Sequence, residues 1–337
     1  MTLSINKVTT AGIREWDKIW HNCDYATYFH SREWAEIWQN YTNQKMKPDP
    51  RLILFSDGKK VILPFSVSKS FKGILRNYIS SPAGTFGGWI AEDQLSIEHS
   101  QILVDYICKQ GDRLTWRLNP YDEVLHQCNF DKVLLKNDET HAIDLSCGFD
   151  AVYKKWAKGR SALARKARKA RKAGISVRIA DSQQDWDGYY KIYEDSLRRW
   201  GESASSVYHW SLFNEIFQLD SPNIKLWLAV YEEKTVAGAL CFYTKKHVAY
   251  WHGSALAKYF DLRPVNLLMF EIIKDACEKG YQFFDFNPSG GHEGVKNFKK
   301  SFGAVPLICP VVRKVNNTSK LLSKVKNIFS VERENNE

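Results

Sequence analysis

The chain has 337 residues, of which 44% are hydrophobic and 14% aromatic, and it carries a formal net charge of +10 at neutral pH. This composition excludes a disordered chain, and the lack of an 18-residue apolar run or a signal-peptide pattern excludes a membrane-spanning or secreted one, so we expect a cytoplasmic protein with room for two domains. The positive surplus favours polyanionic partners, which include nucleic acid, nucleotide-sugar phosphates and an anionic membrane face.

The first half of the sequence predicts a helix, a strand hairpin, a loop, a second helix and a strand. Apolar residues recur at helical spacing over 29–38, "FHSREWAEIW". A hairpin follows at 51–67, with Asp57-Gly58 as its turn. The loop "SSPAGTFGGW" then leads to a helix over Ile97–Lys109 and to the strand "LTWRLNP", which ends in Asn-Pro.

The second half repeats this order. Helical spacing recurs at 208–217, "YHWSLFNEIF", and a hairpin follows at 224–243. The loop "FDLRPVN" leads to a helix over 267–280 and to the strand "FFDFNP", which also ends in Asn-Pro. The similarity lies in the layout more than in residue identities. It predicts a tandem duplication of an α/β (mixed α+β) module.

The join is expected after the strand-like "THAIDLS", which gives domains at 1–150 and 151–315. Ala157–Gly174 predicts a helix, because it is rich in helix formers and ends on glycine. Eight lysines and arginines between Lys158 and Lys172 cover this helix outside a stripe of alanines. Contact with phosphates and an ordinary solvated face both explain that charge. The basic amphipathic tail at 316–337 could rest on an anionic membrane or pack on the body.

Motifs for metal and hydrolase chemistry are missing from the sequence. The seven cysteines are scattered and form no CxxC pair, so neither a disulfide framework nor a cysteine zinc site is expected. There is no HExxH, no GxSxG, no Walker A loop and no dinucleotide fingerprint. We therefore expect no metal.

Asp285 and Lys299 carry the strongest chemical signals. Strand alternation in "QFFDFN" places Phe283, Asp285 and Asn287 on one face. Asp285 either lies near a ligand, or caps the next turn, or pairs with a neighbouring lysine. Lys299 lies on the expected apolar stripe of a helix, four residues after Val295 and three before Phe302. It either extends to solvent or offers a fixed positive charge to an oxyanion or phosphate. Lys296 and Lys300 are expected to face solvent.

Other candidates are weaker. His252 alternates with Tyr250 and Ser254 on one expected strand face, as a general base or a structural hydrogen-bonder. Arg263 precedes Pro264 at a helix start, where an anion would bind. Arg198, Arg199 and Trp200 end another helix, where the helix dipole favours cations. In the loop "SSPAGTFGGW", Gly87 and Gly88 permit either the close approach of a ligand or a plain turn.

With these elements in order, the sequence resembles the FemAB-like branch of the GNAT acyltransferase superfamily. The resemblance covers most of the chain. It is carried by the segments "FHSREWAEIW", "SSPAGTFGGW", "IDLS", "ARKARKARKAGISV", "YEDSLRRWG", "YWHGSA" and "FDFNPSGGHEGVKNFKKSFGA". It implies two tandem GNAT-like domains with a cleft between them, and transfer of an acyl or aminoacyl group to an amine. In peptidoglycan-bridge members the donor is an aminoacyl-tRNA and the acceptor is a nucleotide- or lipid-linked muropeptide.

The resemblance also assigns roles to residues. Lys299 falls where the family places a lysine that supports transfer. Arg199, or equally Arg198, falls near an arginine that contacts acceptor phosphate. Two departures are visible. Trp38 stands where the peptidoglycan enzymes usually carry a lysine, and "YFDLRPVN" replaces the glycine-containing loop that holds the pyrophosphate of acetyl-CoA.

The sequence thus predicts an acyltransferase that acts on an amine of a cell-envelope precursor, either an amino sugar or a peptide. The co-substrate is an acyl donor, aminoacyl-tRNA or acyl-CoA, and tRNA and the anionic inner membrane face are further expected partners. One alternative is an acyl-CoA-dependent N-acetyltransferase of a surface-polysaccharide amino sugar, and another is a non-catalytic RNA- or membrane-binding protein. The expected site residues are Lys299, Asp285 and His252 for catalysis, Arg263 and Asn266 for the donor, and Arg199, Trp200, Gly87 and Gly88 for the acceptor.

Overall fold

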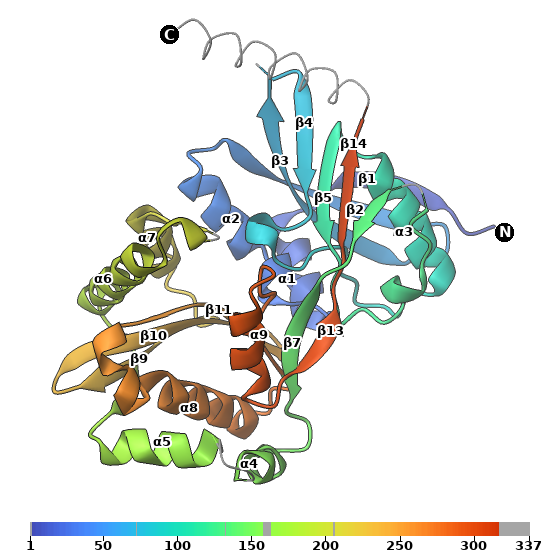
Figure 1. The fold of residues 1–337 in the computed structure, drawn as a ribbon. Helices are drawn as coiled ribbons and strands as arrows, with labels where there is room; N and C mark the ends of the chain where they lie inside the picture. The colour runs from blue at the N-terminus through green and yellow to red at the C-terminus, as the bar shows by residue number, and fades with distance from the viewer. Residues whose placement is uncertain (1, 72, 132, 158–162, 205, 317–337) are drawn as a thin grey trace, which may run out of the picture. The chain divides into compact units, whose positions relative to one another are not determined.

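The computed structural model describes residues 2–71, 73–131, 133–157, 163–204 and 206–316, which form two compact units (Figure 1). Unit 1 holds the described residues of Met1–Tyr25, Phe29–Asp138 and Cys309–Glu337, and unit 2 those of Ala26–Tyr28 and Glu139–Ile308. Each unit is built on a seven-stranded mixed sheet flanked by helices. The predicted α/β class with two similar modules is confirmed. The expected domain boundary after residue 150 stays a prediction.

Unit 1 is formed mainly by the first half of the chain. Its sheet has the order β1-β2-β3-β4-β5-β14-β6. Its elements are β1 (Ile5–Thr10), α1 (Ile13–Asn22), α2 (Arg32–Tyr41), β2 (Met46–Phe55), β3 (Lys60–Ser70), β4 (Leu75–Ile79), α3 (Ile97–Lys109), β5 (Arg113–Arg117), β6 (Leu134–Lys136) and β14 (Val311–Val315). The core forms where alternate apolar residues of β2 and β3 meet the apolar side of α3, and includes Phe55, Val61, Leu63, Leu103 and Ile107.

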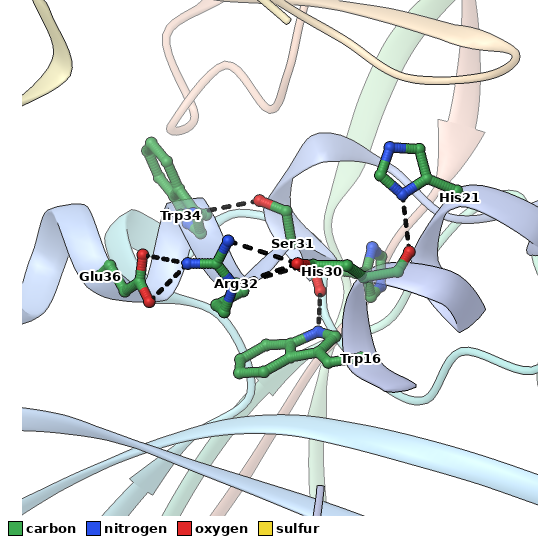
Figure 2. Close-up of polar contacts among 8 residues, drawn as sticks. Trp16, His21, His30, Ser31, Arg32, Trp34 and Glu36 are labelled. Atoms are coloured by element: carbon green, nitrogen blue, oxygen red, sulfur yellow. Dashed lines mark hydrogen bonds and ion pairs between the residues drawn. The ribbon is translucent and has the colours of Figure 1, made fainter. Parts of the chain in front are cut away.

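The motif "FHSREW" fixes the start of α2 (Figure 2). Ser31 accepts a hydrogen bond from the backbone N–H of Trp34 at 3.1 Å, so the helix begins at Arg32 and not at 29 as predicted. Arg32 forms ion pairs with Glu36 at 2.6 Å and Asp17 at 3.3 Å, and Trp16 donates to the carbonyl of His30 at 2.9 Å. These contacts join α1 to α2, so the motif has a structural role.

Unit 2 has the sheet order β13-β7-β12-β11-β10-β9-β8. Its elements are β7 (Glu139–Asp144), α4 (Phe149–Ala157), α5 (Leu163–Lys172), β8 (Ser176–Ile179), α6 (Gln183–Trp200), α7 (Trp210–Gln218), β9 (Ile224–Tyr231), β10 (Lys234–Tyr243), β11 (His247–Ala255), α8 (Pro264–Glu278), β12 (Phe283–Asp285), α9 (Glu293–Lys300) and β13 (Val305–Ile308). Helix α8 packs on one face of the sheet, with α5 and α4 outside it, and α6 packs on the opposite face (Figure 1).

The two sheets show the same duplication that the sequence layout predicts. When the strand order of the second sheet is reversed, each of its strands corresponds to one strand of the first sheet. Each sheet then has a single parallel pair at the same position, β4 with β5 in unit 1 and β11 with β12 in unit 2. At one corresponding position, each sheet takes its strand from the other half of the chain. β7 comes from the first half and pairs with β12 in unit 2, while β14 comes from the end of the described chain and pairs with β5 in unit 1. Sequence reasoning did not anticipate this exchange.

The predicted helix over Ala157–Gly174 differs from the structure. Helix α4 ends at Ala157 and α5 covers Leu163–Lys172, while residues 158–162 lie outside the described residues. The tail predicted at 316–337 lies outside them too, apart from Asn316. Among the described helices, none is long and apolar enough to cross a membrane.

Candidate functional site

Asp285 is the last residue of β12, a three-residue strand held between β11 and β7. Its side chain is buried, with 1% of its surface exposed. One carboxylate oxygen accepts two hydrogen bonds, from the hydroxyl of Thr140 and from the backbone N–H of Asn287, each at 2.6 Å. These two bonds fix the orientation of the carboxyl group, and the bond from Asn287 caps the turn that follows Asp285.

Asn287 links Asp285 to Lys299. Its N–H donates to Asp285, its carbonyl accepts from the ammonium of Lys299, and its side-chain amide donates to the carbonyl of Tyr250 at 2.8 Å. The backbone at Asn287 has φ of 58°, a left-handed conformation that asparagine tolerates better than most residues. Sequence reasoning placed Asn287 on the face of Asp285 but gave it no role. The Asn-Pro step after a strand was the available signal.

Lys299 is buried, with 3% of its surface exposed, so the alternative in which it extends to solvent is wrong. It lies near the end of α9. Its neighbour Phe298 packs against Phe302, with the two ring centroids 4.8 Å apart. Val295 does not belong to this buried stripe, because 40% of its surface is exposed. The short α9 reaches the core only with its last turn. A buried ammonium needs compensating polar partners, and the Asn287 carbonyl is one of them.

The other two lysines of α9 differ from each other. Lys300 is exposed, as predicted, but Lys296 is half-buried and forms an ion pair with Glu139 of β7 at 3.1 Å. Under the same helix lies His141, which is fully buried and whose ring nitrogens have no hydrogen-bond partner among the described residues. Burial lowers the pKa of His141, and the positive charge of Lys299 adds to the effect. The neutral His141 was missed because a lone strand histidine gives no sequence signal.

Strand β11 separates from its parallel neighbour beside this group. It pairs with β12 only from His247 to Ala249, yet continues to Ala255. The separation begins where Asn287 binds the carbonyl of Tyr250. Beyond that point, β12 supplies no ladder partner to β11.

A β-bulge in β11 overturns one prediction. Cys241 lies opposite Tyr250 and Leu240 opposite His252, so Trp251 is the additional residue. Because residues directly opposite share a face, Tyr250 lies on the face of Cys241, toward α8, while His252 lies on the other face with Leu240. The same reasoning puts Asp285, opposite Ala249, on the face of His252. The predicted alternation of His252 with Tyr250 is therefore wrong.

Aromatic rings surround His252. Tyr193, Phe213 and Tyr189 lie against its imidazole with centroid distances of 4.5, 5.1 and 5.8 Å. The Tyr189 hydroxyl shares a hydrogen bond of 2.6 Å with Nδ1. Burial lowers the pKa of His252 to about 3, because the rings cannot solvate an imidazolium. The imidazole is therefore neutral near pH 7, free to accept a proton but only weakly basic.

We expect His252 to make the fold sensitive to acid. Its folded pKa lies below the unfolded value of about 6.5, so the unfolded chain binds the extra proton and stability falls as pH drops from about 6.5 toward 3. The slope contributed by one proton is at most about 1.4 kcal/mol per pH unit. His252→Gln keeps a partner for Tyr189 but removes this titration. Urea midpoints at pH 7 and 5 should fall more for the wild type than for the variant, and equal falls would contradict the assignment.

Arg263 and Asn266 lie at the start of α8. Arg263 has a left-handed backbone with φ of 62°, is exposed and forms no ion pair with a described residue. Pro264 follows as the first residue of the helix, and Asn266 is half-buried in the first turn. A helix N-terminus with a flanking cation suits a phosphate group. Arg263 and Asn266 thus stay predicted donor contacts.

Arg199 and Trp200 end α6. Arg199 donates to the carbonyl of Ala255, the last residue of β11, at 3.5 Å, and its guanidinium lies 5.2 Å from the ring centroid of Phe260. It also pairs with Asp195 at 3.6 Å. Trp200 is 39% exposed. The Arg199 guanidinium is thus held at the end of β11, the strand from which β12 separates.

Gly87 and Gly88 belong to unit 1 and are buried there. A Cβ atom on Gly87 would come within 2.2 Å of the Ser80 hydroxyl, and one on Gly88 within 3.3 Å of the Trp116 indole. Gly88 also has φ of 124° and donates to Ser80 at 2.6 Å. Packing therefore explains both glycines, and their role in acceptor binding stays a prediction.

The structure thus brings Lys299 and Asp285 together through Asn287, and places His252 on the same sheet face as Asp285. In the ranges that the structure covers, no cluster of three or more His, Cys, Asp or Glu side chains could hold a metal ion.

Residues 157–300 match the model of the acetyltransferase (GNAT) domain family. No curated protein matches the sequence. Among solved structures, FemX is similar with 13% identity and a TM-score of 0.70, over 93% of this chain and 98% of that one. L-PGS from Bacillus licheniformis has 12% identity and a TM-score of 0.51, over 85% and 90%. The C-terminal domain of a putative lysylphosphatidylglycerol synthetase from Agrobacterium fabrum has 14% identity and a TM-score of 0.52, over 78% and 88%.

Proposed function

We propose that this chain, which carries a GNAT acetyltransferase domain within a FemX-like tandem fold, transfers an acyl or aminoacyl group to an amine of a cell-envelope precursor. The observation that carries the proposal is the buried ammonium of Lys299, tied through Asn287 to the buried carboxylate of Asp285, where β11 and β12 separate. Burying an ammonium and a carboxylate is unfavourable for a fold, and such groups are typical of sites that stabilise charge during a reaction.

In the proposed reaction the acceptor nitrogen attacks the donor carbonyl carbon. A C–N bond forms, and the C–O bond of an aminoacyl ester or the C–S bond of a thioester breaks. The attacking amine loses a proton, and the leaving alkoxide or thiolate gains one. Lys299 would stabilise the tetrahedral oxyanion, and Asp285 would orient Lys299 or help to take the ammonium proton. His252, neutral on the same sheet face, would be a second and much weaker proton acceptor, because its pKa is only about 3.

The same proposal assigns binding roles. Arg263 and Asn266, at the start of α8, would hold the donor's phosphates. Arg199 and Trp200 at the end of α6 would contact the acceptor, while an acceptor role for Gly87 and Gly88 of unit 1 stays a separate prediction. One solved structure with a similar fold is the C-terminal domain of a putative lysylphosphatidylglycerol synthetase, whose name refers to a phospholipid. That name supports an acceptor in the envelope.

A second candidate is an acyl-CoA-dependent N-acetyltransferase of a surface-polysaccharide amino sugar. It is favoured by the match to an acetyltransferase domain over residues 157–300. The two candidates share the transfer chemistry and differ in the donor. Neither requires a metal.

The donor can be tested directly on the full chain. We expect labelled aminoacyl-tRNA to bind, to resist excess acyl-CoA and to weaken steeply as salt rises, because phosphate contacts release counterions. Uncharged tRNA is the control, because it measures contact with the phosphate backbone of the tRNA alone. Saturable binding of acyl-CoA without tRNA binding would move the assignment to the second candidate. A failure of both donors to transfer a group to any amine would contradict the proposed function itself.

A further inference from the structure

The outer surface of α5 carries an unusual concentration of positive charge. Its ten residues, "LARKARKARK", include six lysines and arginines and no acidic residue. The buried side is made of Leu163, Ala164, Ala167 and Ala170, which pack toward α8. On the opposite side, four exposed residues follow one another at helical spacing, and we call them the α5 ridge: Arg165, Arg168, Lys169 and Lys172.

The ridge is not neutralised by its surroundings. Arg168 lies 3.5 Å from the hydroxyl of Tyr153, and no acidic side chain of the described residues pairs with any of the four. By contrast Arg171, on the flank of α5, is paired with Glu271 of α8. The neighbouring helix α4 adds two exposed cations, Lys154 and Lys155. Unpaired like charges at i, i+3 and i+4 repel one another, so this arrangement is unfavourable for the isolated fold.

The α5 ridge lies on an outer helix of unit 2. Helices α4 and α5 lie together outside α8 and form the outer layer on that side of unit 2 (Figure 1). The small alanines on the inner side of α5 let it lie close to α8. Because the four ridge residues are exposed on an outer helix, their charges are accessible to a surface that approaches from that side.

We propose that the α5 ridge docks the protein on an anionic phospholipid surface through its headgroup phosphates. A lipid surface fits better than RNA because the ridge offers charge alone: α5 contains only Leu, Ala, Arg and Lys, and so has no aromatic ring to stack on bases and no amide to read them. The ridge lies on the α8 side of the sheet, whereas Asp285 and His252 face the other side. Docking would thus leave the catalytic face uncovered.

The test measures binding of the full chain to vesicles of equal parts phosphatidylglycerol and phosphatidylcholine, with pure phosphatidylcholine vesicles for comparison. The ridge variant combines Arg165→Gln, Arg168→Gln, Lys169→Gln and Lys172→Gln, because glutamine keeps helix propensity and removes charge. Each basic residue near an anionic surface contributes roughly fivefold to partitioning, so we expect a loss of roughly several hundredfold. Thermal unfolding of the variant verifies that it is folded.

A matched control removes the same charge elsewhere. Lys45, Lys191, Lys234 and Lys258 are exposed, and their replacement by glutamine should leave vesicle binding within a few-fold of the wild type. Transfer to a water-soluble amine acceptor should be unchanged in the ridge variant, so this result is separate from the proposed function. Equal vesicle binding by the ridge variant and the wild type would overturn the inference. So would a wild type that ignores anionic vesicles but binds RNA through the ridge.

Discussion

Replacing Lys299 by alanine is expected to lower kcat/KM for group transfer about 100- to 1000-fold, the usual effect of removing one oxyanion-stabilising group. The reason is geometric. Lys299 is 3% exposed and its ammonium is held by the carbonyl of Asn287, so the charge is oriented in advance of the reaction and is little screened by water. The measurement is steady-state transfer from whichever donor the binding experiment identifies.

A loss of activity in Lys299→Ala could also arise from a cavity in the fold, so a second variant is needed. Lys299→Met keeps most of the side-chain volume and removes the charge. Replacing a buried charge with an apolar side chain of similar size is often neutral or stabilising. We therefore expect Lys299→Met to unfold at the same or a higher temperature while transfer falls as in the alanine variant. Transfer near the wild-type rate in Lys299→Met would refute the role of the ammonium.

Lys300→Ala is the matched control, because Lys300 is the next residue on α9 and is exposed. It changes the net charge by the same amount as Lys299→Ala. If transfer depended only on the net positive charge, the two variants would lose equal activity. A specific role predicts that Lys300→Ala changes transfer by no more than a few-fold.

Much of this architecture could be predicted from local patterns. Helical spacing of apolar residues gave α3 its correct bounds, Ile97–Lys109, and strand alternation gave the hairpins and the repeated layout. These signals are periodic and local, so one stretch of chain carries them completely. The same kind of pattern placed Lys299 on the expected apolar stripe of its helix, but it left open whether the side chain is buried or extends to solvent.

What could not be predicted depends on contacts between distant segments or on single backbone angles. The exchange of β7 and β14 joins residues far apart in sequence, and no periodicity encodes which sheet a strand enters. The bulge at Trp251 changes the face of His252, and strand alternation does not show it, although Gly253 lies only two residues further along the strand. Asn287 joins the two charged groups because its φ is positive, a conformation visible only once the turn is formed.

Val295 shows the limit of helical periodicity in a short element. Its spacing from Lys299 is correct for one helix face, yet it is exposed while Lys299 is buried. A helix of eight residues has barely two turns, so only the end that touches the sheet obeys the pattern. Spacing thus indicates which residues share a face, while tertiary packing decides how much of that face is covered.

Asp285→Asn is expected to lower transfer about 100- to 10,000-fold if the carboxylate takes part in moving the ammonium proton. The substitution is a stringent one because asparagine retains an oxygen at the position that accepts from Thr140 and from the N–H of Asn287. It removes the negative charge and changes the volume very little. The measurement is kcat/KM as a function of pH, with thermal unfolding recorded in parallel.

The alternative is that Asp285 only caps the turn before Asn287, and the two roles give different results. A capping role needs an acceptor and not a charge, so Asp285→Asn would then retain transfer within a few-fold. Thr140→Val is the control for lost hydrogen bonding, since it removes the hydroxyl donor and keeps the carboxylate. A role in proton transfer predicts a large loss in Asp285→Asn, a changed pH profile, and only a small loss in Thr140→Val. Equal losses in both would mean that the hydrogen bond, and not the charge, is what the site requires.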